Sequence, residues 1–346
     1  MKRVIVMFDG TWNTPRDHTN VYRLRQAIAP VGADEVPQLL SYHEGVGTSW
    51  HGRLIGGSFG YGLSEIIQAA YKWLAQNFEP HDHLYVFGFS RGAYSARSLV
   101  GLVRKCGVLR SATDQRVDAA YALYRKRGDD PDGPESTTFR ALYSWETRVK
   151  FIGVWDTVGS LGIPLTGLKL PFFRSYYAFH DTELSKIVDY AYHAVALDEF
   201  REDFAPTLWT RTKPQNLAVE QRWFCGAHAD VGGGSEGGRL HELALNWIQQ
   251  KAMDAGLAMR SIYDVKPEDI KAPIHDSFAT FMFGLYRIIK LNHRFVRTFG
   301  KTVGEVISDT VRARHALDLT PPYNPPVLAN VPGWTNSSDP DRPKMA

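Results

Sequence analysis

The sequence His83-Leu84-Tyr85-Val86-Phe87-Gly88-Phe89-Ser90-Arg91-Gly92 joins a short apolar run to a serine that lies between two glycines. The apolar run 83–87 predicts a buried strand, and residues 93–100 predict a helix directly after the turn. A G-x-S-x-G turn between a strand and a helix holds its serine at a strained backbone angle, where larger flanking side chains would clash. The context therefore predicts an α/β fold in which Ser90 is a nucleophile at a strand end.

Further short apolar runs alternate with helical stretches along the chain. Four more runs predict strands, at residues 4–8, 38–42, 149–155 and 221–225, and the spacing of apolar residues predicts helices at 21–29 and 62–78. Strands separated by helices imply crossover connections and a mostly parallel sheet that is covered on both faces. The pattern therefore favours an α/β-hydrolase-like architecture.

The domain organisation follows from the same pattern. We expect a single domain over residues 1–320, with insertions near 111–145 and 160–215 that form a cap or lid. The tail 321–346 is rich in Pro, Asn and Asp, which predicts an irregular structure.

The composition is that of an ordinary globular protein, with 44% hydrophobic and 22% charged residues in a chain of 346. The net charge of +3 is small, and basic residues are interleaved with acidic ones, which argues against a nucleic-acid partner. Two cysteines, Cys106 and Cys225, exclude a disulfide scaffold. We find no signal peptide and no membrane-spanning stretch in the sequence, so we expect a cytoplasmic protein, with signal-independent secretion left open.

A serine nucleophile needs a base and an acid that orients the base, and two later strand ends supply candidates. Asp156 follows the predicted strand 149–155, and His228 follows the predicted strand 221–225. The order Ser, Asp, His is the chain order of this fold, and the carboxyl ends of parallel strands meet at one edge of the sheet. We therefore predict a catalytic triad of Ser90, Asp156 and His228, with neither a cofactor nor a metal.

Backbone N–H groups are expected to stabilise the negative charge that develops on a substrate carbonyl oxygen. One donor is the N–H of Arg91, directly after the nucleophile, and the second lies in the loop after the first strand, at Gly10 or Thr11. The glycines 232–234 follow His228 closely, and their lack of side chains would let the backbone approach a substrate.

Several other residues stay open as alternatives for the base and the acid. His315 is the first alternative to His228, ahead of His193 and His293. Asp230 is an alternative acid, an anchor of the histidine, or a residue that caps the glycine loop through bonds to the backbone.

Asp9 raises two further hypotheses. The motif Phe8-Asp9-Gly10-Thr11 is similar to the first motif of haloacid-dehalogenase-type phosphatases, but Met7 stands where their nucleophilic aspartate is required. Asp9 could also share a divalent metal with His228 and Asp230, because the ligand types fit, although no dedicated metal spacing is present. Both hypotheses rank below the triad.

Five motifs occur together and in order: Phe8-Asp9-Gly10-Thr11-Trp12-Asn13, Gly88-Phe89-Ser90-Arg91-Gly92-Ala93, Val154-Trp155-Asp156-Thr157-Val158, His193-Ala194-Val195-Ala196-Leu197-Asp198-Glu199 and Gly226-Ala227-His228-Ala229-Asp230-Val231-Gly232-Gly233-Gly234. The set resembles the catalytic domain of the type VI secretion phospholipase effectors and their uncharacterised relatives, over residues 1–240. This resemblance implies an α/β-hydrolase core, a triad at Ser90, Asp156 and His228, and phospholipase or carboxylester activity. Ser308 stands where the relatives often carry a further histidine.

Aromatic residues near the predicted strand ends favour an apolar substrate pocket, and they are Trp12, Trp50, Phe59, Tyr61, Phe89 and Trp155. We therefore expect an acyl ester or a phospholipid as the substrate, with transient contact at a membrane surface left open. Residues 278–291 are strongly apolar and form either a core helix or a lid or lipid-facing surface. The apolar run 164–173 raises the same question.

Overall fold

The structure is a computed structural model that describes residues 1–45, 58–126, 128, 130–159, 182–235, 238–329, 331 and 334, without the side chains of 58–61. Within these residues, seven strands form one parallel sheet in the order β2-β1-β3-β6-β7-β8-β9. Their bounds are β1 Arg3–Phe8, β2 Gln38–His43, β3 His83–Phe89, β6 Val149–Trp155, β7 Val188–Ala196, β8 Ala218–Phe224 and β9 Glu305–Ile307. The parallel sheet and the five strands predicted from the sequence are confirmed.

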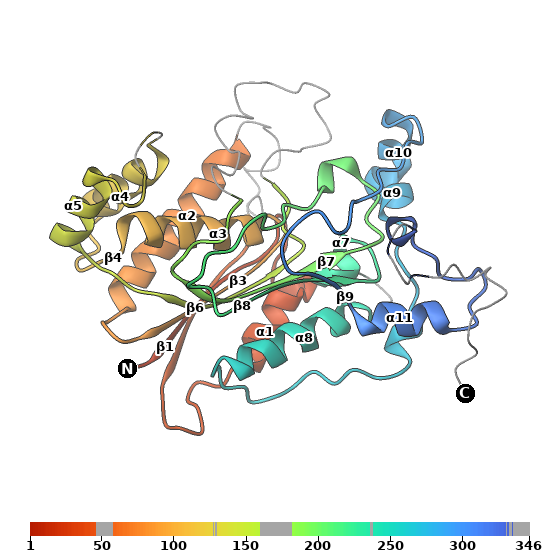
Figure 1. The fold of residues 1–346 in the computed structure, drawn as a ribbon, viewed down its shortest axis with the longest axis horizontal. Helices are drawn as coiled ribbons and strands as arrows, with labels where there is room; N and C mark the ends of the chain where they lie inside the picture. The colour runs from red at the N-terminus through yellow and green to blue at the C-terminus, as the bar shows by residue number, and fades with distance from the viewer. Residues whose placement is uncertain are drawn as a thin grey trace.

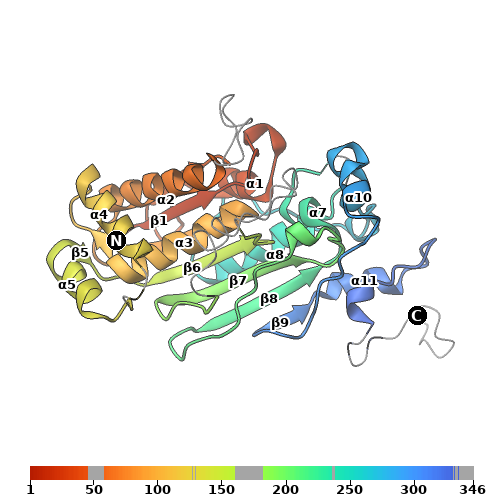
Figure 2. The ribbon, with the colours of Figure 1, turned by 90° about the horizontal axis from the view of Figure 1, so that it is seen from above.

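Helices cover both faces of the sheet, as Figures 1 and 2 show. The helices α2 (Ser58–Asn77) and α3 (Arg91–Cys106) pack on one face, against the side chains of Val4, Val6 and Phe8. The helices α1 (Asn20–Ala27) and α8 (His241–Asp254) pack on the other face, against Ile5 and Met7. Because successive side chains of a strand point to opposite faces, a strand buried on both sides must be apolar throughout. The unbroken apolar run at residues 4–8 has this cause.

The insertion expected at 111–145 is not a cap over the carboxyl ends of the strands. Its helices, α4 (Asp114–Arg125) and α5 (Pro134–Tyr143), pack beside α3, next to the small hairpin of β4 (Val108–Leu109) and β5 (Ser144–Trp145). Figures 1 and 2 place them at the end of the molecule where the N-terminus lies. The reason is the direction of α3, which starts at the carboxyl end of β3 and returns the chain to the amino ends.

The second expected insertion, 160–215, is described only from residue 182, and the apolar run 164–173 lies outside the described residues. The sequence prediction missed β7 and β9. The strand β7 has the alternating apolar and aromatic residues of an inner strand, whereas β9 is a three-residue strand at the edge. Strands as short as β9 leave little periodicity in the sequence.

The stretch 278–291 is not a core helix. The chain forms three short pieces there: α9 (Ser277–Thr280), a 3-10 turn (Phe281–Gly284) and α10 (Leu285–Ile289). Several of its apolar side chains are exposed, among them Phe283, Ile288 and Leu291. Downstream, Ser308 caps α11 (Asp309–Ala316) by accepting from the N–H of Thr310.

Two further expectations concern the whole chain. Cys106 and Cys225 are both buried, and they form no disulfide with each other. Among the described residues, no helix combines the length and the apolar character that a membrane span requires.

Candidate active site

Ser90 lies in the turn between β3 and α3, at the carboxyl edge of the sheet. Its backbone φ is 57° and its ψ −122°, a conformation that non-glycine residues rarely adopt. A side chain at Gly88 would place its Cβ 2.5 Å from the carbonyl oxygen of Gly92, and one at Gly92 would lie 2.4 Å from the carbonyl oxygens of Phe8 and Asp9. Both glycines are therefore required by the close passage of β1, β3 and α3.

The structure brings Ser90, His228 and Asp156 together, as the sequence predicted. His228 begins α7 (His228–Gly232) after β8, and its Nε2 lies 2.8 Å from Ser90 Oγ. Its Nδ1 lies 2.6 Å from Asp156 Oδ2, and Asp156 directly follows β6. All three side chains are buried. The hydroxyl, imidazole and carboxylate thus form one hydrogen-bonded chain across three strand ends.

The imidazole of His228 is enclosed by aromatic rings. The rings of Phe89 and Phe204 lie 4.7 Å and 5.1 Å from it, centroid to centroid. Burial lowers the pKa of His228, and the hydrogen bond to Asp156 opposes part of that effect. The histidine is therefore neutral at pH 7, so its Nε2 can accept a proton from a serine hydroxyl.

Arg297 is the main functional residue that the sequence did not reveal. Its guanidinium lies fully buried against Asp156, with Nη1 2.6 Å from Oδ1 and Nη2 2.9 Å from Oδ2. It also donates to the carbonyl oxygens of Ala196 and Phe204. Burial alone would raise the pKa of Asp156, but the charge of Arg297 and the hydrogen bond to His228 hold it well below its usual range.

A second buried ion pair supports the histidine from behind. Glu199 Oε2 accepts from the backbone N–H of His228 at 3.2 Å and from the hydroxyl of Ser277 at 2.9 Å. Arg201 binds both oxygens of this carboxylate, and its guanidinium lies 3.5 Å from the ring centroid of Phe204. The carboxylate thus fixes the start of α7 and connects it to α9.

The motif of residues 193–199 is explained by its position at the end of β7. His193 Nε2 accepts from the N–H of Thr157, next to Asp156, and burial lowers the pKa of His193 to about 3. Asp198 Oδ2 accepts from the N–H of Gly226, just before α7. The polar residues of the motif therefore hold the two loops that carry Asp156 and His228.

The candidate oxyanion donors differ in availability. The N–H of Gly10 donates to Asp9 Oδ1 at 2.7 Å, so it is already engaged. Thr11 is the remaining candidate in that loop, and among the described residues its buried Oγ1 has no hydrogen-bond partner. Arg91 is the first residue of α3, and the N–H groups of a first helical turn have no acceptor in their own helix.

Asp9 and Asp230 make other contacts and do not belong to the triad. Asp9 Oδ2 accepts from the hydroxyls of Thr19 and Tyr42. Asp230 Oδ2 accepts from the N–H groups of Ala227 and His275, so it bonds to the backbone as predicted, but at other residues than the glycine loop.

A metal shared by Asp9, His228 and Asp230 has no support in this arrangement. Both ring nitrogens of His228 are taken by Ser90 and Asp156. Among the described residues, no group of three His, Cys, Asp or Glu side chains is placed to hold a metal ion.

The histidines that the sequence offered as alternatives to His228 form no hydrogen bond with Ser90 or Asp156. His315 Nδ1 pairs with the carbonyl oxygen of Tyr323, and its ring packs on Trp334, which fixes the C-terminal part of the fold. His293 is exposed next to α10.

The glycines after His228 also act differently from the expectation. A Cβ at Gly232 would lie 1.9 Å from the ring of Phe89, so this glycine makes room for an aromatic side chain of the site itself.

The predicted aromatic pocket is only partly present. Phe89 lies in the site, and Trp12 is half-exposed with the Arg91 guanidinium 5.5 Å from its ring centroid. Trp155 is fully buried in the core and cannot line a pocket. Trp50 and the side chains of Phe59 and Tyr61 lie outside the described residues. Phe204 and Phe281, which the sequence did not single out, form the wall beside His228.

The parallel sheet, its helical layers and the polar residues at its carboxyl edge define an α/β protein of the α/β-hydrolase type. The chain belongs to the family described as the catalytic domain of Tle1-like phospholipase effectors of the type VI secretion system, whose model matches residues 2–251. The family resemblance predicted from the motifs is thereby confirmed.

One curated relative matches part of the chain. The uncharacterised protein YEL023C of Saccharomyces cerevisiae is 30% identical over 235 residues, which are 60% of this chain and 33% of that protein. The chain therefore spans about a third of the length of this curated relative.

Two solved structures are similar to the chain. An uncharacterised protein from Pseudomonas aeruginosa has a TM-score of 0.44 and 19% identity, with 83% of this chain and 50% of that one covered. The esterase Est2 of Thermogutta terrifontis, with propionate bound, has a TM-score of 0.40 and 14% identity, with 75% of this chain and 86% of that one covered.

Proposed function

We propose that this chain is a serine hydrolase that cleaves carboxylic esters of lipids through an acyl-enzyme. The observation that carries the proposal is the hydrogen-bonded chain from Ser90 Oγ through His228 to Asp156, at 2.8 Å and 2.6 Å. A non-catalytic binding module would have no use for this alignment or for the strained backbone of Ser90.

The reaction proceeds in two halves. Ser90 Oγ attacks the ester carbonyl carbon while His228 Nε2 takes the hydroxyl proton, and His228 then gives this proton to the departing alcohol. Water next attacks the acyl-serine, giving its proton to Nε2. The bond to Ser90 Oγ breaks, the proton returns to Oγ, and the carboxylic acid leaves.

The other groups of the site stabilise the charges that form during the reaction. Asp156 accepts the Nδ1–H of His228 and stabilises the imidazolium that forms. Arg297 acts through Asp156, as a positioning residue, by keeping the carboxylate ionised and in place. The N–H group of Arg91, directly after Ser90, and that of Thr11, in the loop after β1, stabilise the tetrahedral oxyanion.

Membership of a phospholipase effector family supports a lipid ester as the substrate. The aromatic wall of Phe89, Phe204 and Phe281 suits an acyl chain, for which each buried methylene contributes about 0.8 kcal/mol. Extending a test ester from acetate to octanoate is expected to raise kcat/KM, by up to roughly 5 kcal/mol in activation free energy. A flat or falling series would remove the lipid assignment and leave a small-ester esterase.

The nucleophile is tested by substitution with a matched control. Ser90→Ala should abolish ester cleavage and labelling by a fluorophosphonate probe, because among the described residues Ser90 supplies the hydroxyl that pairs with His228 Nε2. Ser95→Ala removes a buried hydroxyl from the same helix, where Ser95 Oγ bonds to the Arg91 carbonyl oxygen, and should keep both signals. Labelling that persists in Ser90→Ala would overturn the proposed mechanism.

The reaction class needs a second measurement, because thioesterases and peptidases share the same triad chemistry. The full chain should be assayed against a panel of acyl esters, phospholipids, thioesters and peptides. We expect the highest kcat/KM for an ester of a long acyl chain. Preference for a thioester or peptide would retain Ser90 as nucleophile and change the substrate class.

A further inference from the structure

Between residues 281 and 291 the chain exposes apolar side chains to solvent. Phe283 is fully exposed, and Leu291 is 88% exposed. Leu285, Ile288 and Ile289 of α10 are also exposed, while Tyr286 points inward and donates its hydroxyl to Asp203. Single exposed apolar residues are common on protein surfaces, but a group of them within a few turns marks a surface that binds something.

Residues on either side of this stretch in the chain contact the candidate active site. At one end, the Ser277 hydroxyl donates to Glu199, which holds the N–H of His228. At the other end, Arg297 binds Asp156. Between them, the Phe281 ring packs 5.8 Å from Phe204, the aromatic wall of the histidine. The segment that carries the exposed apolar residues is therefore joined on both sides to the edge of the sheet that holds Ser90, Asp156 and His228.

The sequence of the same segment is basic, but carboxylates from outside it pair with two of its cations. From residue 277 to 304 the chain contains no Asp or Glu, and its basic residues are Arg287, Lys290, Arg294, Arg297 and Lys301. Arg287, His293 and Arg294 are exposed. Arg294 forms an ion pair with Asp276 at 2.6 Å, and Lys290 pairs with Glu202 and Asp203. Among the described residues, Arg287 is therefore the exposed cation of this surface that has no ion pair. Exposed apolar side chains beside the unpaired guanidinium of Arg287 complement an anionic lipid bilayer, in which acyl chains lie beneath negatively charged headgroups.

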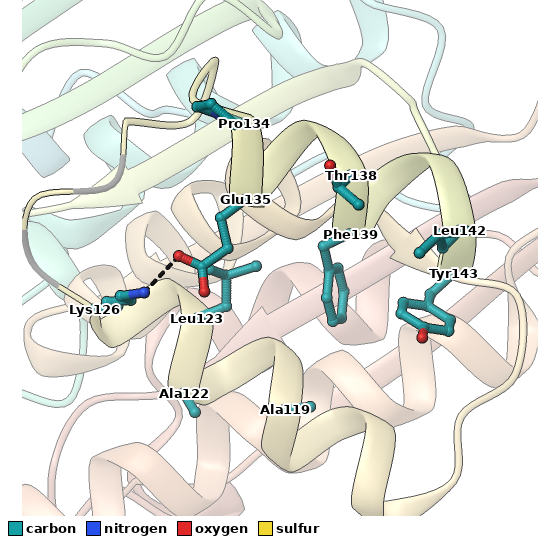
Figure 3. A pocket seen from close by; sticks show the side chains of 10 residues that line it. All are labelled: Ala119, Ala122, Leu123, Lys126, Pro134, Glu135, Thr138, Phe139, Leu142 and Tyr143. Carbon is teal, nitrogen blue, oxygen red and sulfur yellow. Dashed lines mark hydrogen bonds and ion pairs between the residues drawn. The ribbon is translucent and has the colours of Figure 1, made fainter.

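A second apolar surface of the molecule serves as a contrast. The hollow between α4 and α5, of about 780 Å³, is lined by apolar side chains including Leu123, Phe139 and Leu142 (Figure 3). Figures 1 and 2 place these helices at the opposite end of the molecule from α7, α9 and α10. The ion pair of Lys126 with Glu135 lies in its wall, so its charge is balanced there.

We propose that residues 281–294 form a docking surface for anionic lipid bilayers, which presents the carboxyl edge of the sheet to the membrane. Phe283, Leu285, Ile288, Ile289 and Leu291 insert among the acyl chains, and Arg287 binds the negatively charged headgroups. The choice of a lipid partner rests on the proposed function, but the binding itself requires no catalysis.

The test uses the full chain carrying Ser90→Ala, so that lipid is bound and not consumed. Co-sedimentation is measured with vesicles of phosphatidylcholine alone and of phosphatidylcholine with phosphatidylglycerol. We expect binding to the anionic vesicles that weakens with added salt. Phe283→Ser with Leu291→Ser should lower the partition coefficient by about tenfold to a hundredfold, since two apolar side chains lose their insertion. Leu142→Ser, which changes a leucine that is 60% exposed at the α4–α5 hollow, should leave it unchanged.

Several outcomes would overturn the docking surface. The first is a Ser90→Ala chain that binds neither kind of vesicle. The second is an equal loss of vesicle binding in Leu142→Ser. The third is binding of equal strength to vesicles with and without phosphatidylglycerol. Size-exclusion chromatography tests whether a second copy of the chain binds this surface. An oligomer that dissociates in the double variant would assign the surface to that second copy instead.

Turnover of a soluble short-chain ester, measured with Ser90 restored, separates this proposal from the proposed function. Vesicle binding by the Ser90→Ala chain, together with no turnover by the chain with Ser90 restored, would retain the surface and remove the enzyme. A loss of soluble-ester turnover in the double variant as large as its loss of vesicle binding would mean a damaged site, and would overturn the docking surface.

Discussion

Two buried aspartates follow strands at the same edge of the sheet, and they have opposite electrostatic surroundings. Asp9 follows β1 and is 3% exposed, and Asp156 follows β6 and is fully buried. Asp9 receives the hydroxyls of Thr19 and Tyr42 and the N–H of Gly10, all of them neutral donors. Asp156 receives the guanidinium of Arg297.

The consequence is seen in the two pKa values. Burial raises the pKa of Asp9 to about 6, even though its hydrogen bonds favour the ionised form. Burial acts on Asp156 in the same direction, but the Arg297 charge and the His228 bond reverse it. Of these two buried carboxylates, the one beside a cation therefore stays ionised and can stabilise an imidazolium throughout the neutral range.

The largest difference between the two positions is expected for Asp156→Asn. The amide cannot stabilise the imidazolium and favours the wrong histidine tautomer, so kcat for a soluble ester should fall by about 10⁴-fold. Asp9→Asn is the matched control and should change kcat by less than about tenfold, because Asp9 contacts neither His228 nor Ser90. A comparable loss in both variants would show that the two carboxylates are equivalent.

The next effect concerns Arg297→Met. Removing one partner of a buried ion pair should lower the free energy of unfolding by about 3–5 kcal/mol, measured by urea denaturation. Arg287→Met, the same substitution at an exposed arginine of α10, should change it by less than about 0.5 kcal/mol.

The pH dependence of kcat/KM in Arg297→Met tells whether Arg297 positions the Asp156 carboxylate for the reaction or only stabilises the fold. His228 has a lowered pKa in the native site, so its base form persists below pH 6.5. Without Arg297, the negative charge of Asp156 favours the imidazolium, and the acid limb of kcat/KM should move to higher pH. Arg297→Lys restores the charge and should move the limb back. An unshifted limb in Arg297→Met would make Arg297 a structural residue only.

The smallest effect is the pH dependence of stability at Asp9. Its native pKa is about 6 and its ordinary value is 3.8, so the native state binds more protons than the unfolded state between these values. Stability should therefore fall as pH rises from about 4 to 6, by up to about 3 kcal/mol from this group.

Asp9→Asn should reduce that slope, because the amide can donate to the two hydroxyls without ionising. Some slope will remain, since burial also raises the pKa of Asp198 and Asp230. Urea denaturation of both chains at pH 4 and pH 7 measures the difference. Equal slopes in the two chains would contradict the raised pKa of Asp9.

Three residues of the site could be predicted from the sequence because each lies in a short, recognisable stretch. The turn at Ser90 needs two glycines, and both are visible in five residues. Asp156 and His228 follow apolar runs that read as strands, and parallel strands bring their ends together. The position of these three side chains could thus be predicted before any contact was known.

What the sequence did not reveal depends on contacts between distant residues. Arg297 is 141 residues from Asp156 and belongs to no motif; its one hint is its apolar neighbours in Phe295-Val296-Arg297. The turn 281–284 was equally hidden, because its apolar composition is also that of a core helix and periodicity cannot separate the two. Burial and charge compensation are set by the packed fold.

The bond between Asp156 and Arg297 also crosses the limit of the family match. The carboxylate lies within residues 2–251, and the guanidinium lies after them. A catalytic unit cut at that limit would hold an unneutralised charge in its core, so the shared part of the chain is not self-sufficient. The charge balance of the site is thereby coupled to a stretch of chain that the family match does not include.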